Sequence, residues 1–194
     1  MLAASAAAWA AGVNPAMIAR ALTTFRADPA TAPGRFNVLG VAGRQVIVDY
    51  GHNTAAMRAL AEALPRDGAR KTLMVVGLPG DRRDEDLITT FQAAMPMADE
   101  YVVHDLKNLR GRTRNEVPQL MMSCITDGRP CQVVADPKEG ISRAFHRTQP
   151  GDRIIVIADE VDEALELVNA LACEHDEELC SSPVWSGGEA ASAL

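Results

Sequence analysis

Apolar residues in the first part of the chain recur with a helical period. Residues 2 to 12 are rich in alanine and predict one helix, and a second helix is predicted from Pro15 to Phe25. Asn14 supplies a cap for this second helix, and Pro15 suits its first turn. Two short helices cannot build a core alone, so this hairpin must pack on the rest of the chain or on a neighbouring domain.

Prolines and a glycine then interrupt the pattern. Arg26 to Gly34 is therefore predicted to be a linker. After it, short apolar runs alternate with amphipathic stretches, which is the pattern of a parallel sheet covered by helices. The predicted strands are Phe36–Val41, Gln45–Asp49, Thr72–Val76, Tyr101–His104, Gln132–Ala135 and Arg153–Ala158. The predicted helices are Thr54–Leu64, Asp84–Met95, Glu116–Ile125 (capped by Asn115), Lys138–Arg147 and Val161–Cys173.

The fold class expected from this alternation is α/β. It is a Rossmann-like, mainly parallel sheet with helices on both faces, preceded by the short helical hairpin. The first two strands flank Ala42-Gly43-Arg44 and are expected to pair as a hairpin at the domain entrance. Three segments follow: residues 1–32 as helices and linker, 33–173 as the main domain, and 174–194 as an acidic, then Ser- and Gly-containing flexible tail.

The amino-acid composition and charge limit the classes of protein to which this chain can belong. The chain has 194 residues, of which 47% are hydrophobic and 23% charged, so it belongs to the soluble globular class. A net charge of -7 provides no overall basic field for a polyanion, which argues against nucleic-acid binding. No apolar run reaches the roughly 20 residues that a spanning helix needs, and the alanine-rich start lacks a basic n-region. We expect a cytoplasmic protein without a membrane segment.

The four cysteines do not have metal-site spacing. Cys124 precedes Cys131, and Cys173 precedes Cys180, by the same interval, and neither pair is a C-x-x-C pattern. His175 lies beside the second pair, but reduced thiols are the favoured interpretation. No metal site is predicted in this chain.

The most informative polar cluster is Asp49-Tyr50-Gly51-His52-Asn53, which directly follows a predicted strand and precedes a helix. In α/β proteins this is the ligand-facing edge of the sheet. The cluster is suited to holding a nucleotide at the helix N-terminus. The alternative is a simple helix cap with a surface histidine.

Two further clusters follow strands in the same way. Gly77 to Asp84 is a glycine-bearing loop with charges, but it matches neither G-x-G-x-x-G nor G-x-x-x-x-G-K-[ST]. It is either part of a ligand site or a tight turn with a solvated charge run. Ala158-Asp159-Glu160 ends the last strand, and its carboxylates fit a cation, a ribose or an amine, or else Asp159 caps the next helix.

A local basic patch occupies Asp105 to Arg114, with four cations in an otherwise acidic chain. The planar guanidinium fork of arginine grips carboxylates and phosphates. An anionic ligand is one interpretation, and an ordinary surface loop with scattered arginines is the other.

Together, these clusters resemble the C-terminal domain of the Mur ligase family. The motifs are Pro33-Gly34-Arg35-Phe36, Asp49-Tyr50-Gly51-His52-Asn53, Gly77 with Gly80-Asp81-Arg82, and Asp105 with Arg110. The cyanophycin synthetase branch matches best, through Gly80 to Asp86, Leu109-Arg110-Gly111-Arg112 and Ile157-Ala158-Asp159; the G-K-G-H-E of the muramyl-tripeptide ligases is absent. Residues 2–25 look like the closing helices of that family's central ATPase domain.

The resemblance implies an acid–amino acid ligase reaction. A carboxylate is phosphorylated by ATP, and an amino group then attacks the acyl phosphate to form an amide bond. The central domain would hold the P-loop and Mg, while the C-terminal domain closes over ATP and receives the incoming amino acid, which is arginine in the cyanophycin branch. Catalysis would come from alignment and charge neutralisation.

The same resemblance implies roles for ten residues. ATP contacts are assigned to Arg35, Asp49, Tyr50, His52 and Asn53. The reaction cleft is assigned to Asp81 and Arg82, and the amino-acid pocket to Asp105, Arg110 and Arg112. We further expect Arg35, His52, Arg82 and Arg110 to converge around one cleft.

The sequence contains no G-x-x-x-x-G-K-[ST], so we expect it to be catalytically incomplete without a P-loop central domain, in the same or a separate chain. A second hypothesis is a non-catalytic, stand-alone module that binds a nucleotide or an amino acid. A third, a flavodoxin- or receiver-like signalling domain, fits the alternation but does not explain Arg35 together with the cluster after Val48.

Overall fold

The computed structural model describes residues 2–64 and 68–175. Its helices are α1 Leu2–Ala10, α2 Pro15–Thr24, α3 Thr54–Ala63, α4 Asp84–Ala94, the 3-10 turn η1 Met95–Met97, α5 Glu116–Ser123, α6 Pro137–Arg147 and α7 Val161–His175. Its strands are β1 Asn37–Val41, β2 Arg44–Asp49, β3 Thr72–Val76, β4 Glu100–His104, β5 Cys131–Val134 and β6 Arg153–Ile157. No helix within these two ranges has the length and apolar character needed to cross a membrane.

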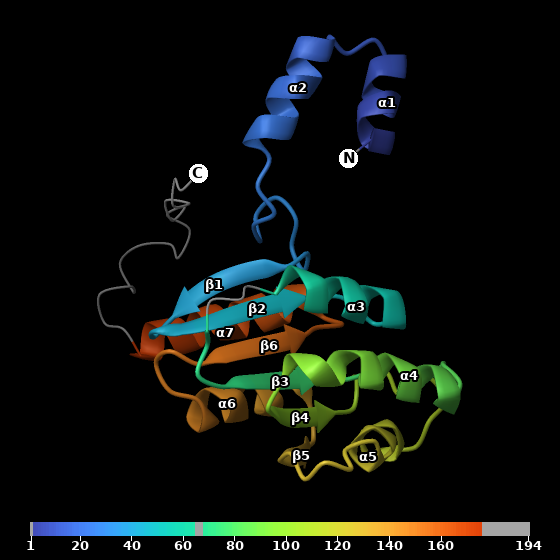
Figure 1. Cartoon of the computed structure of the whole chain (residues 1–194), viewed down its shortest axis with the longest axis vertical. Helices are drawn as coiled ribbons and strands as arrows, with labels where there is room; N and C mark the ends of the chain where they lie inside the picture. Colours follow the sequence, from blue (N-terminus) through green and yellow to red (C-terminus); the bar gives the residue numbers. More distant parts are fainter. Residues whose placement is uncertain (1, 65–67, 176–194) are drawn as a thin grey trace.

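The six strands form one sheet in the order β1-β2-β6-β3-β4-β5 (Figure 1). Only β1 runs antiparallel to its neighbour, so the sheet is mainly parallel as expected. The last strand, β6, lies between β2 and β3, which places Ile157 opposite both Asp49 and Val76. The carboxyl ends of β2, β3, β4 and β6 therefore share one edge of the sheet.

Strands β3, β4 and β6 are buried at every position, which explains the apolar residues at their centres. The edge strand β1 alternates between buried and exposed residues. Helices α3, α4 and α5 cover one face of the sheet, with Met57, Phe91 and Met121 in that core. Helices α6 and α7 cover the other, with Phe145 and Val168 in the second core. The result is a three-layer α/β/α domain.

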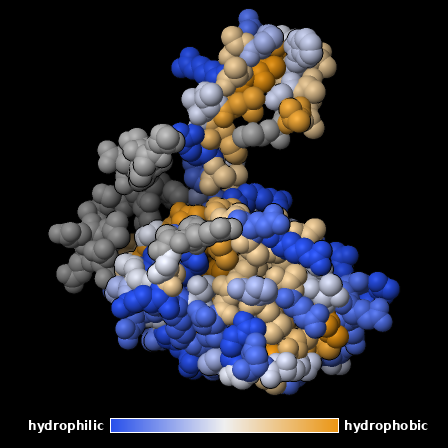
Figure 2. Space-filling model, in the orientation of Figure 1, coloured by the Kyte–Doolittle hydropathy of each residue, from blue (hydrophilic) through white to orange (hydrophobic). Residues whose placement is uncertain are grey.

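The N-terminal hairpin of α1 and α2 stands away from the sheet (Figure 1). None of its residues is buried. Its apolar side chains gather on a surface visible in Figure 2, and Trp9 and Met17 are 67% and 65% exposed. As expected, Asn14 caps α2, because its side chain accepts a hydrogen bond from the Ala16 N–H at 2.8 Å.

The predicted strands and helices are confirmed to within a few residues at their ends. The role given to Asn115 was wrong: it occupies the N-cap position of α5 in a left-handed conformation, but its side chain makes no capping bond. Instead, Glu116 accepts hydrogen bonds from the backbone N–H and the hydroxyl of Thr113. Residues 174 and 175 continue α7, and the rest of the predicted tail lies outside the described residues.

Candidate functional site

The end of β2 is fixed by the carboxylate of Asp49. Its Oδ2 accepts a hydrogen bond from the Phe36 N–H at 2.8 Å, and its Oδ1 accepts one from the Gly51 N–H at 2.7 Å. Phe36 has a φ of 53°, a left-handed conformation that this bond helps to hold. Asp49 thus ties the segment entering the domain to the loop after β2, which positions Arg35, Tyr50 and His52.

Those three side chains form a row. The guanidinium carbon of Arg35 lies 5.6 Å from the centroid of the Tyr50 ring, in cation–π geometry. The His52 ring meets Tyr50 edge to face, with centroids 5.0 Å apart. Tyr50 is 41% exposed, so it offers a cation-backed aromatic surface to a ligand.

His52 is a polar group with unmet hydrogen-bonding capacity. Among the described residues, neither of its buried ring nitrogens has a partner in good hydrogen-bond geometry, although the backbone of Tyr50 lies near enough to favour the protonated ring. Burial lowers the pKa of His52, with the negative charge of Asp159 opposing that shift. A neutral ring with one donor and one acceptor unpaired is the kind of buried polar group that native proteins reserve for a ligand or water.

The neighbouring Asn53 has a local role. Its side chain accepts a hydrogen bond from the Ala56 N–H at 2.9 Å and so caps α3. The capping alternative from the sequence is therefore confirmed for Asn53.

Arg110 joins three loops at the carboxyl edge. Its Nη2 lies 3.3 Å from Oδ1 of Asp159, after β6, and its Nη1 lies 3.6 Å from Oδ2 of Asp81, after β3. Arg110 itself follows β4 and has a φ of 49°. A left-handed conformation at a residue with a large side chain is uncommon and clusters at functional sites. The side chain is 31% exposed and remains reachable by a ligand.

The guanidinium of Arg112, in contrast, is bonded to other residues of this domain. It donates to the backbone oxygens of Gly80 and Arg82, at 3.0 and 2.7 Å, and pairs with Asp84 and Glu116, both at 2.7 Å. These contacts fasten the loop after β3 to the start of α5, and they hold the pKa of Glu116 down to about 2.

Asp105 also holds its own loop, because its Oδ2 accepts a hydrogen bond from the Asn115 N–H at 2.7 Å. The geometry thus favours a positioning role for both Asp105 and Arg112.

The ten predicted site residues lie along one edge of the sheet. Arg35, Tyr50 and His52 lead to the charges of Asp159 and Arg110, which both act on His52. Arg110 leads in turn to Asp81, which lies 3.9 Å from the Nε of Arg82. The Arg82 and Asp81 side chains are 58% and 50% exposed, so this stretch is an open row. That Arg35, His52, Arg82 and Arg110 converge around one cleft stays a prediction.

Sequence reasoning missed one residue of this edge, His104. It ends β4 and is 1% exposed, and its Nε2 has no hydrogen-bond partner in the structure. Gly77 makes room for it, since a Cβ on Gly77 would lie 2.6 Å from Cε1 of His104. A histidine at the end of a buried strand, beside a glycine-bearing loop, was the available signal.

Within residues 2–64 and 68–175, no three His, Cys, Asp or Glu side chains gather to form a metal site. Cys124 and Cys131 are thiols, and burial raises the pKa of Cys131 to about 11. Cys180 lies outside the described residues.

A mainly parallel sheet with helices on both faces and polar loops at the carboxyl ends of its strands defines a doubly wound α/β domain. Residues 34–160 match the family model described as Mur ligase, glutamate ligase domain. The chain belongs to the Mur ligase family, as its C-terminal domain. It is similar to the cyanophycin synthetase of Crocosphaera subtropica, with 33% identity over 87% of this chain and 20% of that protein.

Solved structures show the same fold. A bifunctional folylpolyglutamate synthase/dihydrofolate synthase from Yersinia pestis superposes with a TM-score of 0.59, at 23% identity, over 84% of this chain and 35% of that one. A second structure of that enzyme, complexed with AMPPNP and Mn ion, gives a TM-score of 0.54 at 20% identity, over 76% and 32% of the two chains. The present chain spans about a fifth of the length of the cyanophycin synthetases that it matches.

Proposed function

We propose that this chain is the C-terminal domain of an ATP-dependent acid–amino acid ligase of the cyanophycin synthetase type. It closes over ATP and binds the incoming amino acid, arginine, and it needs a P-loop central domain for activity. The observation that carries this proposal is Arg110, which draws the loops after β3, β4 and β6 together through Asp81 and Asp159. Family membership supplies the reaction class.

The row of Arg35, Tyr50 and His52 at the carboxyl edge of the sheet fits a nucleotide. Tyr50 presents an exposed aromatic face, Arg35 adds a cation behind it, and His52 offers one unpaired donor and one unpaired acceptor. An adenine base needs stacking and hydrogen bonds of this kind, and a phosphate needs a cation. When bound, ATP supplies the phosphoryl group that activates the acceptor carboxylate. The Mg ion is assigned to the central domain, as the family resemblance implies.

The charges around Arg110 fit an amino acid. Asp81 is half exposed and can receive an α-ammonium group, while Arg110 and Arg82 can orient a carboxylate. Asp105 and Arg112 would act by holding this loop rigidly, because positioned charges lower the barrier more than mobile ones do. The role of the domain is thus to align the amine and balance charge, without a protein nucleophile.

The exposed hairpin of α1 and α2 is typical of helices that pack against a further domain. Trp9 and Met17 of this hairpin are 67% and 65% exposed, and Phe25, which follows α2, is 49% exposed; monomeric proteins seldom leave large apolar patches in water. We assign this hairpin as the last part of the central ATPase domain, whose remainder would bury it.

Complementation tests the proposal. The chain is mixed with a separately expressed P-loop central domain of a cyanophycin synthetase, and phosphate release is measured with ATP, Mg and arginine. We expect release that depends on both domains and on arginine. Replacing His52 or Arg110 with alanine should slow it about tenfold or more, since each removes hydrogen bonds to a charged ligand. Arg58→Ala, on the exposed surface of α3, is the matched control.

The alternative is a non-catalytic module that binds a nucleotide or an amino acid. The observation in its favour is the absence of a P-loop motif from these 194 residues. Calorimetry of the isolated chain with ATP-Mg and with arginine separates the two. Binding without phosphate release in the complementation mixture would favour the module, and no binding of either ligand would contradict both.

A further inference from the structure

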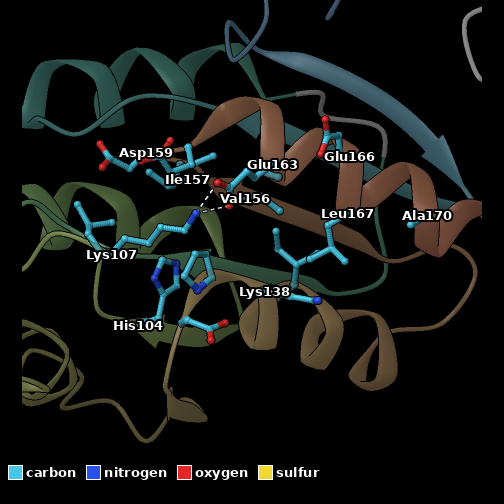
Figure 3. A pocket seen from close by; sticks show the side chains of 17 residues that line it. His104, Lys107, Lys138, Val156, Ile157, Asp159, Glu163, Glu166, Leu167 and Ala170 are labelled. Atoms are coloured by element: carbon cyan, nitrogen blue, oxygen red, sulfur yellow. Dashed lines mark hydrogen bonds and ion pairs between the residues drawn. The ribbon is translucent and has the colours of Figure 1, made fainter.

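The strand β1 is the outermost strand of the sheet, and it contributes no residue to the proposed ligase site (Figure 1). The cavity between α6 and α7 (Figure 3) lies at the ends of β4 and β6, and no residue of β1 lines it. In the strand order, β1 has β2 as its single neighbour. Among the described residues, the other long side of β1 therefore has no strand beside it.

The turn between β1 and β2 sets the hydrogen-bonding pattern of the pair. Ala42 and Gly43 both have positive φ, 47° and 72°, as in the type I′ turn of a two-residue hairpin. In such a hairpin, the two residues that flank the turn exchange both of their backbone hydrogen bonds. Here these residues are Val41 and Arg44, which are opposite each other in the register.

The alternation of an antiparallel pair then decides which residues of β1 face outwards. Leu39 bonds to β2, whereas the N–H and C=O groups of Val38 and Gly40 point away from it. The far side of β2 agrees with this pattern. Gln45, which is opposite Gly40, donates its N–H to the Asp152 carbonyl oxygen at 3.0 Å and so faces β6.

The outward side of β1 is open. Among the described residues, neither Val38 nor Gly40 makes a backbone hydrogen bond to any other segment. The Val38 side chain is 45% exposed, and a Cβ on Gly40 would have no heavy atom within 4 Å. β1 also lacks the charged residues and prolines with which proteins block exposed strand edges. Such an edge is a template for a further strand.

The sequence of β1 is complementary to a second copy of itself. A two-fold axis through Leu39 places Val38 of each copy opposite Gly40 of the other. Both residues face outwards, so each of these two pairs exchanges two backbone hydrogen bonds. The exposed Val38 side chain then covers the bare backbone of the opposing Gly40. No like charges meet, because β1 has no charged residue.

We propose that two copies of this chain associate by antiparallel pairing of their β1 strands, which joins the two sheets into one. Backbone hydrogen bonds supply the attraction, and the contact of Val38 with Gly40 sets the register. Two short strands bury less than the roughly 1,200–2,000 Å² of a standard interface, so the dimer is weak and forms at micromolar to millimolar concentrations. The pairing requires neither ATP nor an amino acid.

Sedimentation velocity of the 194-residue chain over a range of concentrations tests the pairing. We expect a reversible monomer–dimer equilibrium. Amide hydrogen exchange, followed by NMR, locates the contact. Exchange at Val38 and Gly40 should slow at least about threefold as the dimer fraction rises, whereas Gly128, in an exposed loop, should not change. A chain that stays monomeric at millimolar concentration, or a dimer without protection at these two residues, would overturn the proposal.

Two substitutions at one position separate strand pairing from other association. Gly40→Pro removes an outward N–H that β2 does not use, and edge strands tolerate proline, so dimerisation should weaken at least about tenfold. Gly40→Ala keeps this N–H and should dimerise within about twofold of the parent chain. Val38→Lys places a charge on the pairing edge and serves as the second variant if Gly40→Pro unfolds. Equal dimerisation of the Pro and Ala variants would contradict the proposal.

The hairpin of α1 and α2 is the competing surface for association, because its apolar side chains are exposed. Trp9→Gln/Met17→Gln makes it more polar, and we expect the dimer to persist in this variant. Loss of the dimer would assign the association to the hairpin and overturn the pairing of β1. None of these measurements involves phosphate release, so the proposed ligase function can fail separately.

Discussion

The carboxylate of Asp49 accepts a hydrogen bond from the backbone N–H of Phe36 at 2.8 Å, across thirteen residues of sequence. This bond closes the domain entrance over the end of β2 and supports the left-handed backbone at Phe36. The loop that carries Arg35 and the loop that carries His52 are therefore positioned by the same side chain.

Asp49→Ala should destabilise the domain by about 1.5–3 kcal/mol, because two backbone N–H groups lose a charged acceptor. Urea unfolding followed by circular dichroism measures the change. Glu62→Ala, on the exposed surface of α3, is the control and should stay within about 0.5 kcal/mol. Equal stabilities of the two variants would contradict the anchoring role of Asp49.

Gly77→Ala should destabilise the domain by about 1–3 kcal/mol, because the added Cβ would lie 2.6 Å from Cε1 of His104 and 2.9 Å from its backbone oxygen. Gly40→Ala is the matched control, since a Cβ there has no neighbour within 4 Å. Thermal unfolding of both variants gives the comparison. A Gly77 variant as stable as the Gly40 variant would mean that β4 shifts freely at His104.

Arg112→Met should return the pKa of Glu116 toward its ordinary value near 4.5, since the hydrogen bond from Arg112 is the main cause of its depression to about 2. With a depressed folded pKa, the contribution of Glu116 to stability is complete above pH 4.5 and is lost as the pH falls toward about 2. Carboxyl NMR titration of Glu116 measures the shift. An unchanged pKa in the variant would show that the Thr113 hydrogen bonds dominate instead.

Stability should also fall as the pH drops below about 6.5, because burial lowers the pKa of both His52 and His104. At pH values below about 6.5 the unfolded chain binds protons that the folded domain does not, so the free energy of unfolding decreases. Urea unfolding at pH values on either side of 6.5 measures the slope. His104→Phe should flatten it, whereas His146→Gln, at an exposed position on α6, should not. Identical slopes in the two variants would contradict this account of His104.

Hydrophobic patterning along the chain was enough to predict the strands and helices and the edge of the sheet at which polar groups gather. A short apolar run such as Ile154–Ile157 favours a buried strand, and polar residues that follow parallel strands meet at the carboxyl edge. That reasoning places Asp49, Asp81, Arg110 and Asp159 at the carboxyl edge of the sheet before any coordinates are known.

Which residues become neighbours across that edge depends on the packed fold. The insertion of β6 between β2 and β3 places Ile157 opposite Asp49, although more than a hundred residues separate them, and it brings Asp159 to Arg110. The burial of His104 and the cavity between α6 and α7 also depend on how separate units pack. Local periodicity reports which residues face a core, but strand order and helix spacing arise from long-range packing, which a one-dimensional pattern does not encode.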